Sequence, residues 1–373
     1  MNKVINISGY EIGMGRPPFM IAEISCNHLG DLDRAKDILR AVKDAGADAV
    51  KLQTYTADTL TMNGKQQHFQ IDHPLWNNMS LHDLYKKAQT PFEWMKPLFD
   101  LGKELGITVF SAPFDLTAAD LLIELDAPIF KIASFEAVHI PLIKKVAATG
   151  KPLIISTGMA NEQEIEEALN AARNAGCDNI MLLHCISSYP TPIEQANLLT
   201  IEMLCERFNV PVGLSDHTTD SLVAELAVGL GACIVEKHVM LEAGDDSFDK
   251  EFSLIPSEFA ELVQRCKAQT PEHFKKQLLD DNVQKILGVG SFKMKDGEKN
   301  STIFRPSILV SSDIKAGDKF TEDNLIIRRP SAGLPPKYWD ELIGETASCN
   351  LKYGDAMDWN YVENTNKTKI SGK

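Results

Sequence analysis

The sequence predicts a (β/α)8 barrel, the TIM-barrel fold of the α/β class, followed by a small β-rich domain. Eight short apolar runs alternate with amphipathic helical segments through the first 270 residues, which is the element order of a parallel barrel. No G-x-G-x-x-G motif follows the first run, which disfavours a doubly wound open sheet, the main alternative. After residue 300, short strand-like runs and Gly/Pro turns replace the helical pattern.

Each apolar run has the length of a buried strand, and each is followed by a segment with helical periodicity. Residues 31–46 (DLDRAKDILRAVKDAG) follow the first run, and residues 161–176 (NEQEIEEALNAARNAG) follow the fifth. The eight runs cover residues 19–25, 49–54, 107–113, 129–134, 152–158, 180–185, 211–217 and 233–240.

One connection, residues 55–91, is too long for an ordinary loop between a strand and its helix. The loops that follow the strands build the active site of a parallel barrel. We therefore expect this insertion to cover or shape the functional site.

The chain divides into four parts. Residues 1–270 form the predicted barrel, and the lysine-rich residues 271–300 form a linker that is helical in part. Residues 301–364 form the small β-rich domain, which is near the lower size limit for independent folding. The polar tail, residues 365–373, is expected to be disordered.

Charge and cysteine content argue against several classes of protein. The formal net charge is −14, with acidic and basic residues mixed along the chain, whereas nucleic acids and anionic membranes attract clustered positive charge. We therefore expect neither as a partner. The seven cysteines form no C-x-x-C pair, which favours free thiols in a reducing compartment. Without an apolar leader or an 18-residue apolar span, the chain is expected to be cytoplasmic.

Polar side chains gather at the C-terminal ends of the predicted strands, where barrel active sites lie. Residues two apart on a strand share a face, so many of these side chains are expected to point the same way. They are Glu23 and Ser25, Lys51 and Gln53, Lys131 with Ser134 and Glu136 beyond it, Ser156, Ser187 and Tyr189, Ser215 and His217, and Glu236 and His238. Taken singly, such a histidine or lysine is more often a satisfied core residue or a snorkelling side chain. Together they predict a functional site.

Two histidines in this set suggest a metal. His217 and His238, from neighbouring strands, can hold one divalent ion and leave positions open for substrate. Asp216 has the opposite parity to His217, so we expect it to do no more than orient that histidine from behind.

The remaining polar residues suggest an anion and proton transfer. Two lysines with several hydroxyls suit a phosphate or carboxylate group, and Glu23 and Glu136 are candidates for general acid and base. A metal, an anion site and two carboxylates suit the polarisation of a carbonyl beside a phosphorylated partner. The anion-binding candidates are Lys51, Lys131, Ser134, Ser156 and Ser215.

Several ordered motifs resemble the N-acetylneuraminate synthase family of nonulosonic acid synthases. They are IAEISCNHLGD, AVKLQTYTADTL, KIASFE, ISTGMA, HCISSYPTP, GLSDHT and VEKH. Further along, RPSILVSSDIKAGDKFTEDNLIIRRPSAG resembles the antifreeze-like (SAF) domain at the C-terminus of those enzymes. The resemblance covers nearly the whole chain.

The resemblance implies condensation of phosphoenolpyruvate with an open-chain hexosamine aldehyde, with cleavage of a C–O bond and release of phosphate. It implies a divalent metal (Mn, Mg or Co), held by His217 and His238, that polarises the sugar aldehyde. It also implies that Arg329, in RRPSAG, reaches from the SAF domain into the barrel of a partner subunit in a domain-swapped homodimer.

The same motifs imply roles for individual residues. Because EAGDDSFDKEFSLIP is longer than the usual family segment, Asp249 is aligned through FSL, and Asp245 or Asp246 could take its role. Glu136 is implied to handle protons. The residues implied to bind phosphoenolpyruvate are Lys51, Lys131, Ser134, Ser156, Ser187 and Ser215. Those implied to contact the sugar or the attacking water are Glu23, Gln53, Tyr189 and Asp249.

Departures from the sialic acid synthases point to the substrate. Those enzymes usually read KIGSGE and HCTNIYP, so that Phe135 here replaces a glycine and Ser187 replaces an asparagine; Ala112 replaces a common threonine. Residues 73–94 are similar to pseudaminic acid synthases. A bulkier, less polar wall fits a 2,4-diacetamido-2,4,6-trideoxy hexose, so we expect a pseudaminic acid synthase. A sialic or legionaminic acid synthase, or a non-catalytic carbohydrate-binding protein, is the alternative.

Overall fold

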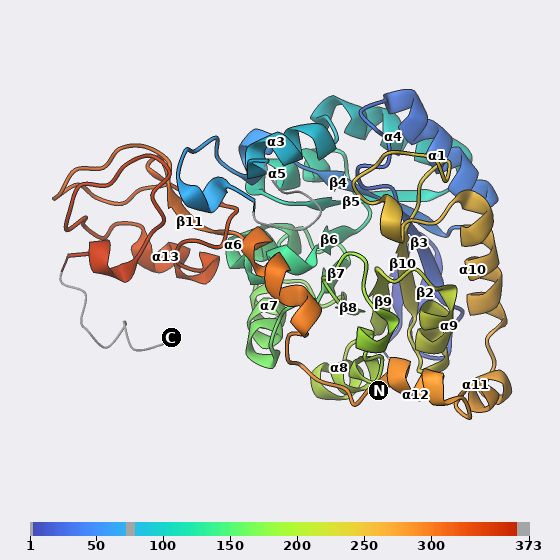
Figure 1. Cartoon of the computed structure of the whole chain (residues 1–373). Coiled ribbons are helices and arrows are strands. Elements are labelled where there is room, and N and C mark those ends of the chain that lie inside the picture. Colours follow the sequence, from blue (N-terminus) through green and yellow to red (C-terminus); the bar gives the residue numbers. More distant parts are fainter. Residues whose placement is uncertain (1–2, 72–78, 364–373) are drawn as a thin grey trace.

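Eight parallel strands close into a barrel in the computed structural model, which describes residues 3–71 and 79–363. The strands follow around the barrel in chain order, and β10 pairs with β3 to close it (Figure 1). The predicted TIM-barrel fold is confirmed, and each predicted run contains one strand. The strands are β3 (Phe19–Glu23), β4 (Ala49–Thr54), β5 (Thr108–Pro113), β6 (Phe130–Ile132), β7 (Leu153–Ser156), β8 (Ile180–Cys185), β9 (Val212–Asp216) and β10 (Ile234–His238).

Helices surround the barrel and bury the outer face of the strands. In α1, Asp31 caps the first turn, and the apolar stripe that includes Ile38 and Val42 is fully buried. Side chains of this kind form the core between strands and helices. The surrounding helices are α1 (Leu32–Asp44), α4 (Phe92–Leu105), α5 (Leu116–Glu124), α6 (Ile140–Ala147), α7 (Glu162–Asn174), α8 (Thr200–Phe208), α9 (Ser221–Gly229) and α10 (Pro256–Ala268). Short 3-10 turns follow three strands: η2 (Ser134–Val138), η3 (Ile193–Gln195) and η4 (Lys250–Phe252).

An N-terminal hairpin, β1 (Ile5–Ile7) with β2 (Tyr10–Ile12), covers the end of the barrel at which the strands begin. Its isoleucines are buried with Phe19 and Ile234, the first residues of β3 and β10. The hairpin was not among the predicted elements. It leaves the opposite end, where the strands terminate, for the site described below.

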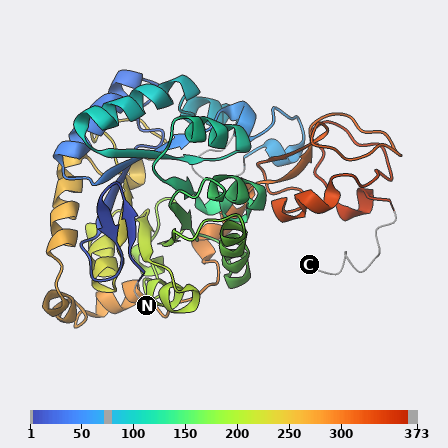
Figure 2. The ribbon, with the colours of Figure 1, turned by 180° about the vertical axis from the view of Figure 1, so that it is seen from behind.

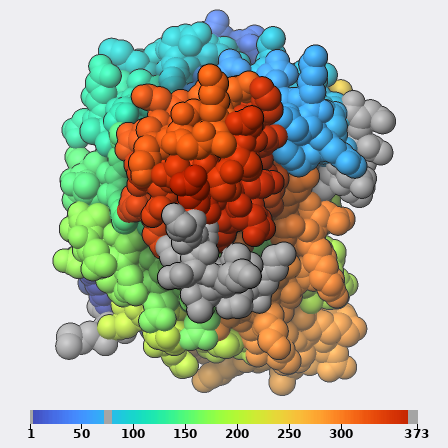
Figure 3. Space-filling model, turned by 90° about the vertical axis from the view of Figure 1, so that its left-hand side faces the viewer, coloured from blue at the N-terminus to red at the C-terminus, as the bar shows by residue number. Residues whose placement is uncertain are grey.

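The long connection after β4 folds into α2 (Ala57–Leu60), η1 (Gln67–Phe69) and α3 (Leu81–Ala88). Residues 72–78, part of the predicted insertion, lie outside the described residues. The connection lies beside the C-terminal domain, as the blue and red segments in Figure 3 show. Met62 and Phe69 pack against Leu309 of that domain, so the insertion joins the two domains.

Residues 271–300, predicted as a linker, contain α11 (Pro271–Gln277) and α12 (Asp281–Leu287). Val283, Ile286 and Leu287 pack into the outer core of the barrel. A 3-10 segment, η5 (Asp296–Phe304), then leads into the C-terminal domain.

The C-terminal domain is built on an antiparallel pair, β11 (Ser307–Val310) and β12 (Leu325–Arg328). It has its own core, with Phe320 and Leu342 fully buried, and it lies to one side of the barrel (Figures 1 and 2). The rest consists of loops and of η6 (Pro336–Tyr338), α13 (Trp339–Leu342) and η7 (Trp359–Tyr361). The tail predicted at 365–373 lies outside the described residues.

The seven cysteines are free thiols, and five of them are buried. Among the described residues, no helix has both the length and the apolar character needed to cross a membrane.

Candidate active site

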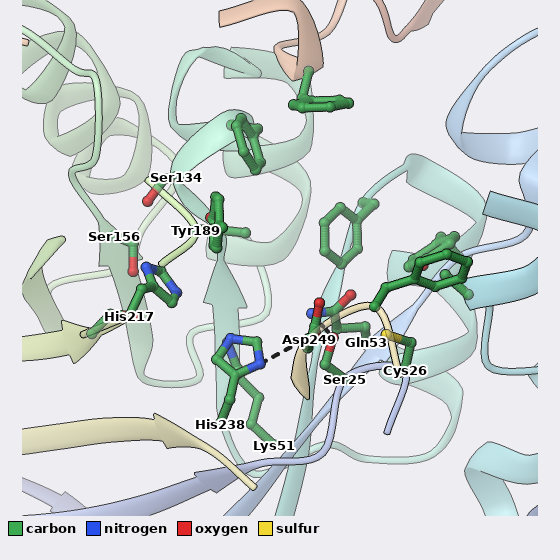
Figure 4. Close-up of a pocket in the computed structure, with 18 of the residues that line it drawn as sticks. Ser25, Cys26, Lys51, Gln53, Ser134, Ser156, Tyr189, His217, His238 and Asp249 are labelled. Atoms are coloured by element: carbon green, nitrogen blue, oxygen red, sulfur yellow. Dashed lines mark hydrogen bonds and ion pairs between the residues drawn. The ribbon is translucent and has the colours of Figure 1, made fainter. Parts of the chain in front are cut away.

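A cavity of about 150 Å³ lies at the C-terminal ends of the strands, as predicted for a barrel active site. The C-terminal domain, through Arg329, and the insertion after β4, through Leu60 and Tyr85, contribute to its wall. Most of the residues predicted from the sequence come together here, and Figure 4 shows many of them around one shared space. Those that line the cavity are Ser25, Lys51, Gln53, Lys131, Ser134, Ser156, Tyr189, Ser215, His217, His238, Asp249 and Arg329.

Three predicted site residues lie directly behind the wall. Glu23, Glu136 and Ser187 are fully buried and do not line the cavity. Glu23 accepts a hydrogen bond from Gln53 at 2.9 Å, while Glu136 contacts Arg329. These three residues can therefore act through their neighbours, or directly after a small movement.

Glu236 joins the two lysines of the site. Its Oε1 accepts hydrogen bonds from Lys51 Nζ at 2.8 Å, from Ser215 Oγ at 3.0 Å and from Lys131 Nζ at 3.4 Å. The sequence placed Glu236 among the polar strand-end residues, on the same face as His238, but gave it no role; it lines the cavity as well. That shared face was the available signal, because the face points into the barrel.

The buried charges shift one another's pKa. Burial opposes ionisation of Glu236, but Lys131 and Lys51 outweigh it and hold the pKa of this carboxyl well below its usual value. Burial would lower the pKa of Lys51, yet Glu23 and Glu236 raise it. Lys131 is farther from its carboxylate, and burial lowers its pKa to about 8. Lys131, whose contact with Glu236 is long, is therefore the cation of this cluster best suited to an anion.

Hydroxyl groups from three strand ends lie beside these lysines. Gly158 donates its backbone N–H to Ser134 Oγ at 3.2 Å. A Cβ atom at Gly158 would lie 2.2 Å from Ser187 Oγ, so a side chain at this position would displace the serine. The buried Ser156 Oγ has no hydrogen-bond partner among the described residues, which leaves it available to a ligand.

The two histidine rings lie side by side, with centroids 5.3 Å apart. His217 Nδ1 is 3.1 Å from the carbonyl oxygen of Ile186, and burial lowers the pKa of the imidazole. A neutral ring that donates from Nδ1 leaves Nε2 as a lone-pair donor. His238 Nδ1 lies 3.3 Å from Asp249 Oδ2, and Phe252 packs against both rings.

The expected role of Asp216 in orienting His217 is wrong. Asp216 Oδ2 pairs with Lys237 Nζ at 2.9 Å, and both side chains are buried. The reason is the strand register: Lys237 is paired with Asp216 across β9 and β10, and both point away from the barrel interior. The carbonyl of Ile186 takes the orienting position instead.

The donor set fits a divalent ion that completes its coordination with water and substrate. Imidazole nitrogens are suitable ligands for such an ion. Within residues 3–71 and 79–363, no group of three or more histidine, cysteine or acidic side chains converges in a way that could hold a metal. His217 and His238 would therefore supply only part of the coordination shell.

Arg329 from the C-terminal domain reaches the barrel. Its guanidinium donates to Glu136 Oε1, with Nη2 at 2.6 Å and Nε at 3.2 Å, and to Tyr85 Oη at 3.0 Å. Burial raises the pKa of Glu136 more than Arg329 lowers it. The backbone of Arg329 is held by Leu60 and Thr61 of the insertion.

These Arg329 contacts are made within a single chain. The exchange of Arg329 between two subunits, which the resemblance implied, therefore stays a prediction.

One side of the cavity is aromatic. The guanidinium carbon of Arg329 lies 4.8 Å from the ring centre of Phe135, and Phe135 meets Phe304 edge to face at 5.8 Å. Phe248 lines the same cavity. Sequence reasoning identified Phe135 but missed Phe248, Phe304 and Tyr85, because these lie in loops and in the insertion, without a periodic pattern.

Of the three candidate aspartates near residue 249, only Asp249 lies at the cavity. Asp245 pairs with Arg34. Asp246 is exposed and pairs with Lys250 at 3.0 Å. The geometry therefore favours Asp249 among the three positions left open by the sequence.

The fold and site define a TIM-barrel protein with a cavity, lined by lysines and histidines, that a C-terminal domain helps to complete. The NeuB family model matches residues 38–273, and the SAF domain model matches residues 305–363. The chain therefore belongs to the NeuB family and carries a C-terminal SAF domain.

Similar proteins span nearly the same length. The pseudaminic acid synthase of Helicobacter pylori is 40% identical over 94% of this chain and 99% of its own. The N,N'-diacetyllegionaminic acid synthase of Campylobacter jejuni is 37% identical over 89% of this chain and 96% of its own. The crystal structure of the spore coat polysaccharide biosynthesis protein SpsE of Bacillus subtilis is 31% identical, with a TM-score of 0.83, and covers 98% of this chain and 100% of its own.

Proposed function

We propose that this NeuB-family synthase condenses phosphoenolpyruvate with an open-chain 2,4-diacetamido-2,4,6-trideoxy hexose to give pseudaminic acid and phosphate. The observation that favours a 6-deoxy sugar over N-acetylmannosamine is the position of Phe135 in the cavity wall, against Arg329 and Phe304. The relatives named pseudaminic acid synthase, at about 40% identity, support the same choice.

The proposed reaction joins C3 of phosphoenolpyruvate to the aldehyde carbon of the sugar. Water adds to C2, and phosphate leaves with the oxygen that had linked it to C2. The water oxygen becomes the oxygen of the new keto group. One of the two water protons ends on the former aldehyde oxygen and the other on the phosphate, so that atoms and charge balance.

Positive charge at the strand ends supports the binding of phosphoenolpyruvate. Lys51 pairs with Glu236 at 2.8 Å and with Glu23 at 3.4 Å, whereas Lys131 has only a long contact, 3.4 Å, with the carboxylate of Glu236. The ammonium of Lys131 is therefore the more available of the two to an anion. The unpartnered Ser156 hydroxyl lies in the same wall. Charge-assisted hydrogen bonds from these groups would hold the phosphate and the carboxylate of the substrate.

Two buried carboxyls are suited to move protons. Burial raises the pKa of both Glu23 and Glu136, which brings a carboxyl closer to the working range of a general acid or base. Each also has one oxygen, Oε2, without a hydrogen-bond partner among the described residues. Glu23 acts beside Gln53 and Asp249 on the sugar and the attacking water, and Glu136 acts beside Arg329.

A divalent ion fits this scheme. Held by His217 and His238, Mn²⁺, Mg²⁺ or Co²⁺ would act as a Lewis acid on the sugar aldehyde. Asp249, 3.3 Å from His238, is placed to orient a hydroxyl group of the sugar or the water.

The aromatic wall favours a deoxy sugar. Phe135, Phe248 and Phe304 present carbon atoms rather than hydrogen-bonding groups, and a hydroxyl group buried against such a wall would lose its hydrogen bonds. A methyl group at C6 of the sugar has no hydrogen bonds to lose there. Sialic and legionaminic acid synthases remain the rival activities.

Phosphate release tests the proposal. Purified protein with Mn²⁺ or Mg²⁺ and phosphoenolpyruvate is offered the diacetamido-trideoxy hexoses of the pseudaminic and legionaminic series, and N-acetylmannosamine. We expect the highest kcat/KM with the pseudaminic precursor. Turnover of N-acetylmannosamine but not of that precursor would refute the choice of sugar. Sugar binding without phosphate release from any of the three would favour the non-catalytic carbohydrate-binding alternative.

A further inference from the structure

Glu298 lies in η5, the segment that runs from the barrel to the SAF domain, and its side chain is buried in the barrel. The residue is 2% exposed. Its Oε1 accepts the backbone N–H of Met159 at 2.9 Å and that of Ser187 at 2.8 Å, and its Oε2 accepts the N–H of Lys295 at 2.9 Å. One carboxylate therefore ties η5 to two loops of the barrel.

Those two loops carry part of the anion site. Met159 lies three residues beyond Ser156, the last residue of β7, and Ser187 lies two residues beyond Cys185, the last residue of β8. β7 and β8 are neighbours in the barrel. The carboxylate of Glu298 therefore bridges the ends of adjacent strands from outside the cavity.

Gly158 shows how closely these loops are fitted. It donates to Ser134 Oγ at 3.2 Å, and a Cβ atom there would lie 2.8 Å from Ser134 Oγ and 2.2 Å from Ser187 Oγ. Glu298 holds the amides of Met159 and Ser187 on either side of this contact. Moving either loop would displace Ser134, which lines the cavity, and Ser187, which lies behind its wall.

Backbone strain in the β7 loop adds a reason for the bond. Met159 has a φ of +61°, the left-handed region that a non-glycine residue occupies only when its surroundings enforce it. The bond from its N–H to Glu298 is one such constraint. A neutral hydrophobic residue at 298 could not supply it.

We propose that Glu298 is a positioning residue for phosphoenolpyruvate. It holds the two loops of the anion site in place only when η5 is docked on the barrel. The inference rests on the proposed function, because it names the ligand of that site. A buried carboxylate near an anion would repel it, so its three N–H partners indicate that Glu298 acts by ordering the loops rather than by touching the substrate.

The test compares three variants with one control in the full chain. E298A removes all three hydrogen bonds. E298Q keeps an oxygen for Met159 and Ser187 and gives up only the bond to Lys295. E298D keeps the charge but is too short to reach both loops. The control, Q195A, removes the hydrogen bond from the neighbouring Gly297 N–H to Gln195 Oε1 and leaves both loops tied.

Calorimetry measures phosphoenolpyruvate binding without sugar, and kinetics give KM for each substrate. In E298A and E298D we expect phosphoenolpyruvate affinity to fall by about tenfold or more, with KM for the sugar changed by less than about threefold. E298Q and Q195A are expected to stay within about threefold of the wild type. E298D and E298Q keep the test informative if E298A does not fold.

Three results would overturn the inference. If the wild type binds phosphoenolpyruvate and both E298D and E298Q bind it as tightly as the wild type, the positioning role alone is refuted. Equal losses for both substrates in E298D would also refute it, because they would indicate a general structural role. A wild type that does not bind phosphoenolpyruvate would refute the proposed function and the inference with it.

Discussion

Arg329 of the SAF domain and Glu136 of the barrel form a buried ion pair, with 2.6 Å between Nη2 and Oε1. The pair joins the two domains at the wall of the candidate active site, which Arg329 lines and behind which Glu136 lies. Breaking one partner of such a pair leaves an uncompensated buried charge. We therefore expect the proposed activity of the barrel to depend on the placement of the C-terminal domain.

The first prediction concerns which subunit supplies Arg329. R329A and E136A are each expected to lose activity by about a hundredfold or more. In a domain-swapped homodimer, mixing and reassembling the two variants would restore roughly a quarter of the wild-type activity, because half of the random dimers would contain one complete site. We expect this recovery in a phosphate-release assay.

A matched control uses two barrel residues. E136A mixed with K131A cannot complement, because both substitutions fall in the same barrel. No recovery in the R329A and E136A mixture would mean that Arg329 serves its own barrel, as it does in the single chain.

The second prediction is a pH dependence of phosphoenolpyruvate binding. The pKa of Lys131 is lowered to about 8, chiefly by burial, so its ammonium is fully present below that pH and is lost as pH rises through it. KM for phosphoenolpyruvate should be flat below about pH 7.5 and rise by up to about tenfold per unit above about pH 8. K131R, which keeps its charge, should remove this rise. A wild-type KM that stays flat to about pH 9.5 would contradict the assignment.

The third prediction concerns the metal. H217A and H238A should each abolish activity and weaken Mn²⁺ binding, measured by calorimetry, by about tenfold or more. H273A is the control, because His273 is exposed and pairs with Glu225 away from the cavity. Full activity in EDTA, or unchanged Mn²⁺ affinity in both variants, would remove the metal from the account.

The fourth prediction concerns the sugar. F135G should shift the kcat/KM ratio from the diacetamido-trideoxy hexose toward N-acetylmannosamine by roughly 10–100-fold, because it opens the apolar wall. F135L keeps an apolar side chain and should retain most of the original preference. An unchanged ratio in F135G would show that Phe135 does not select the sugar.

Strand parity was the most informative sequence signal. It placed Lys51, Lys131, His217 and His238 on the interior face, and the structure brings all four to one cavity. The reason is geometric: a two-residue repeat and a common C-terminal end leave little freedom in a closed parallel barrel.

Side chains outside the strands were much less predictable. Glu298 and Phe304 come from the 3-10 segment η5, where no regular repeat indicates direction. Tyr85 lies on the buried face of α3, and only tertiary packing brings that face to the cavity. The prediction for Asp216 was wrong for a related reason, because the partner of this side chain depends on the register between β9 and β10. The N-terminal hairpin was missed since its strands are only three residues long.

The most direct test of the central claim follows one oxygen atom. Phosphoenolpyruvate labelled with ¹⁸O in its bridging position is incubated with the protein, a divalent metal and the 2,4-diacetamido-2,4,6-trideoxy hexose, and both products are examined by mass spectrometry. The account predicts an acid with the mass of pseudaminic acid and no label, and phosphate that carries the label. No such acid, or label retained in the acid, would contradict it.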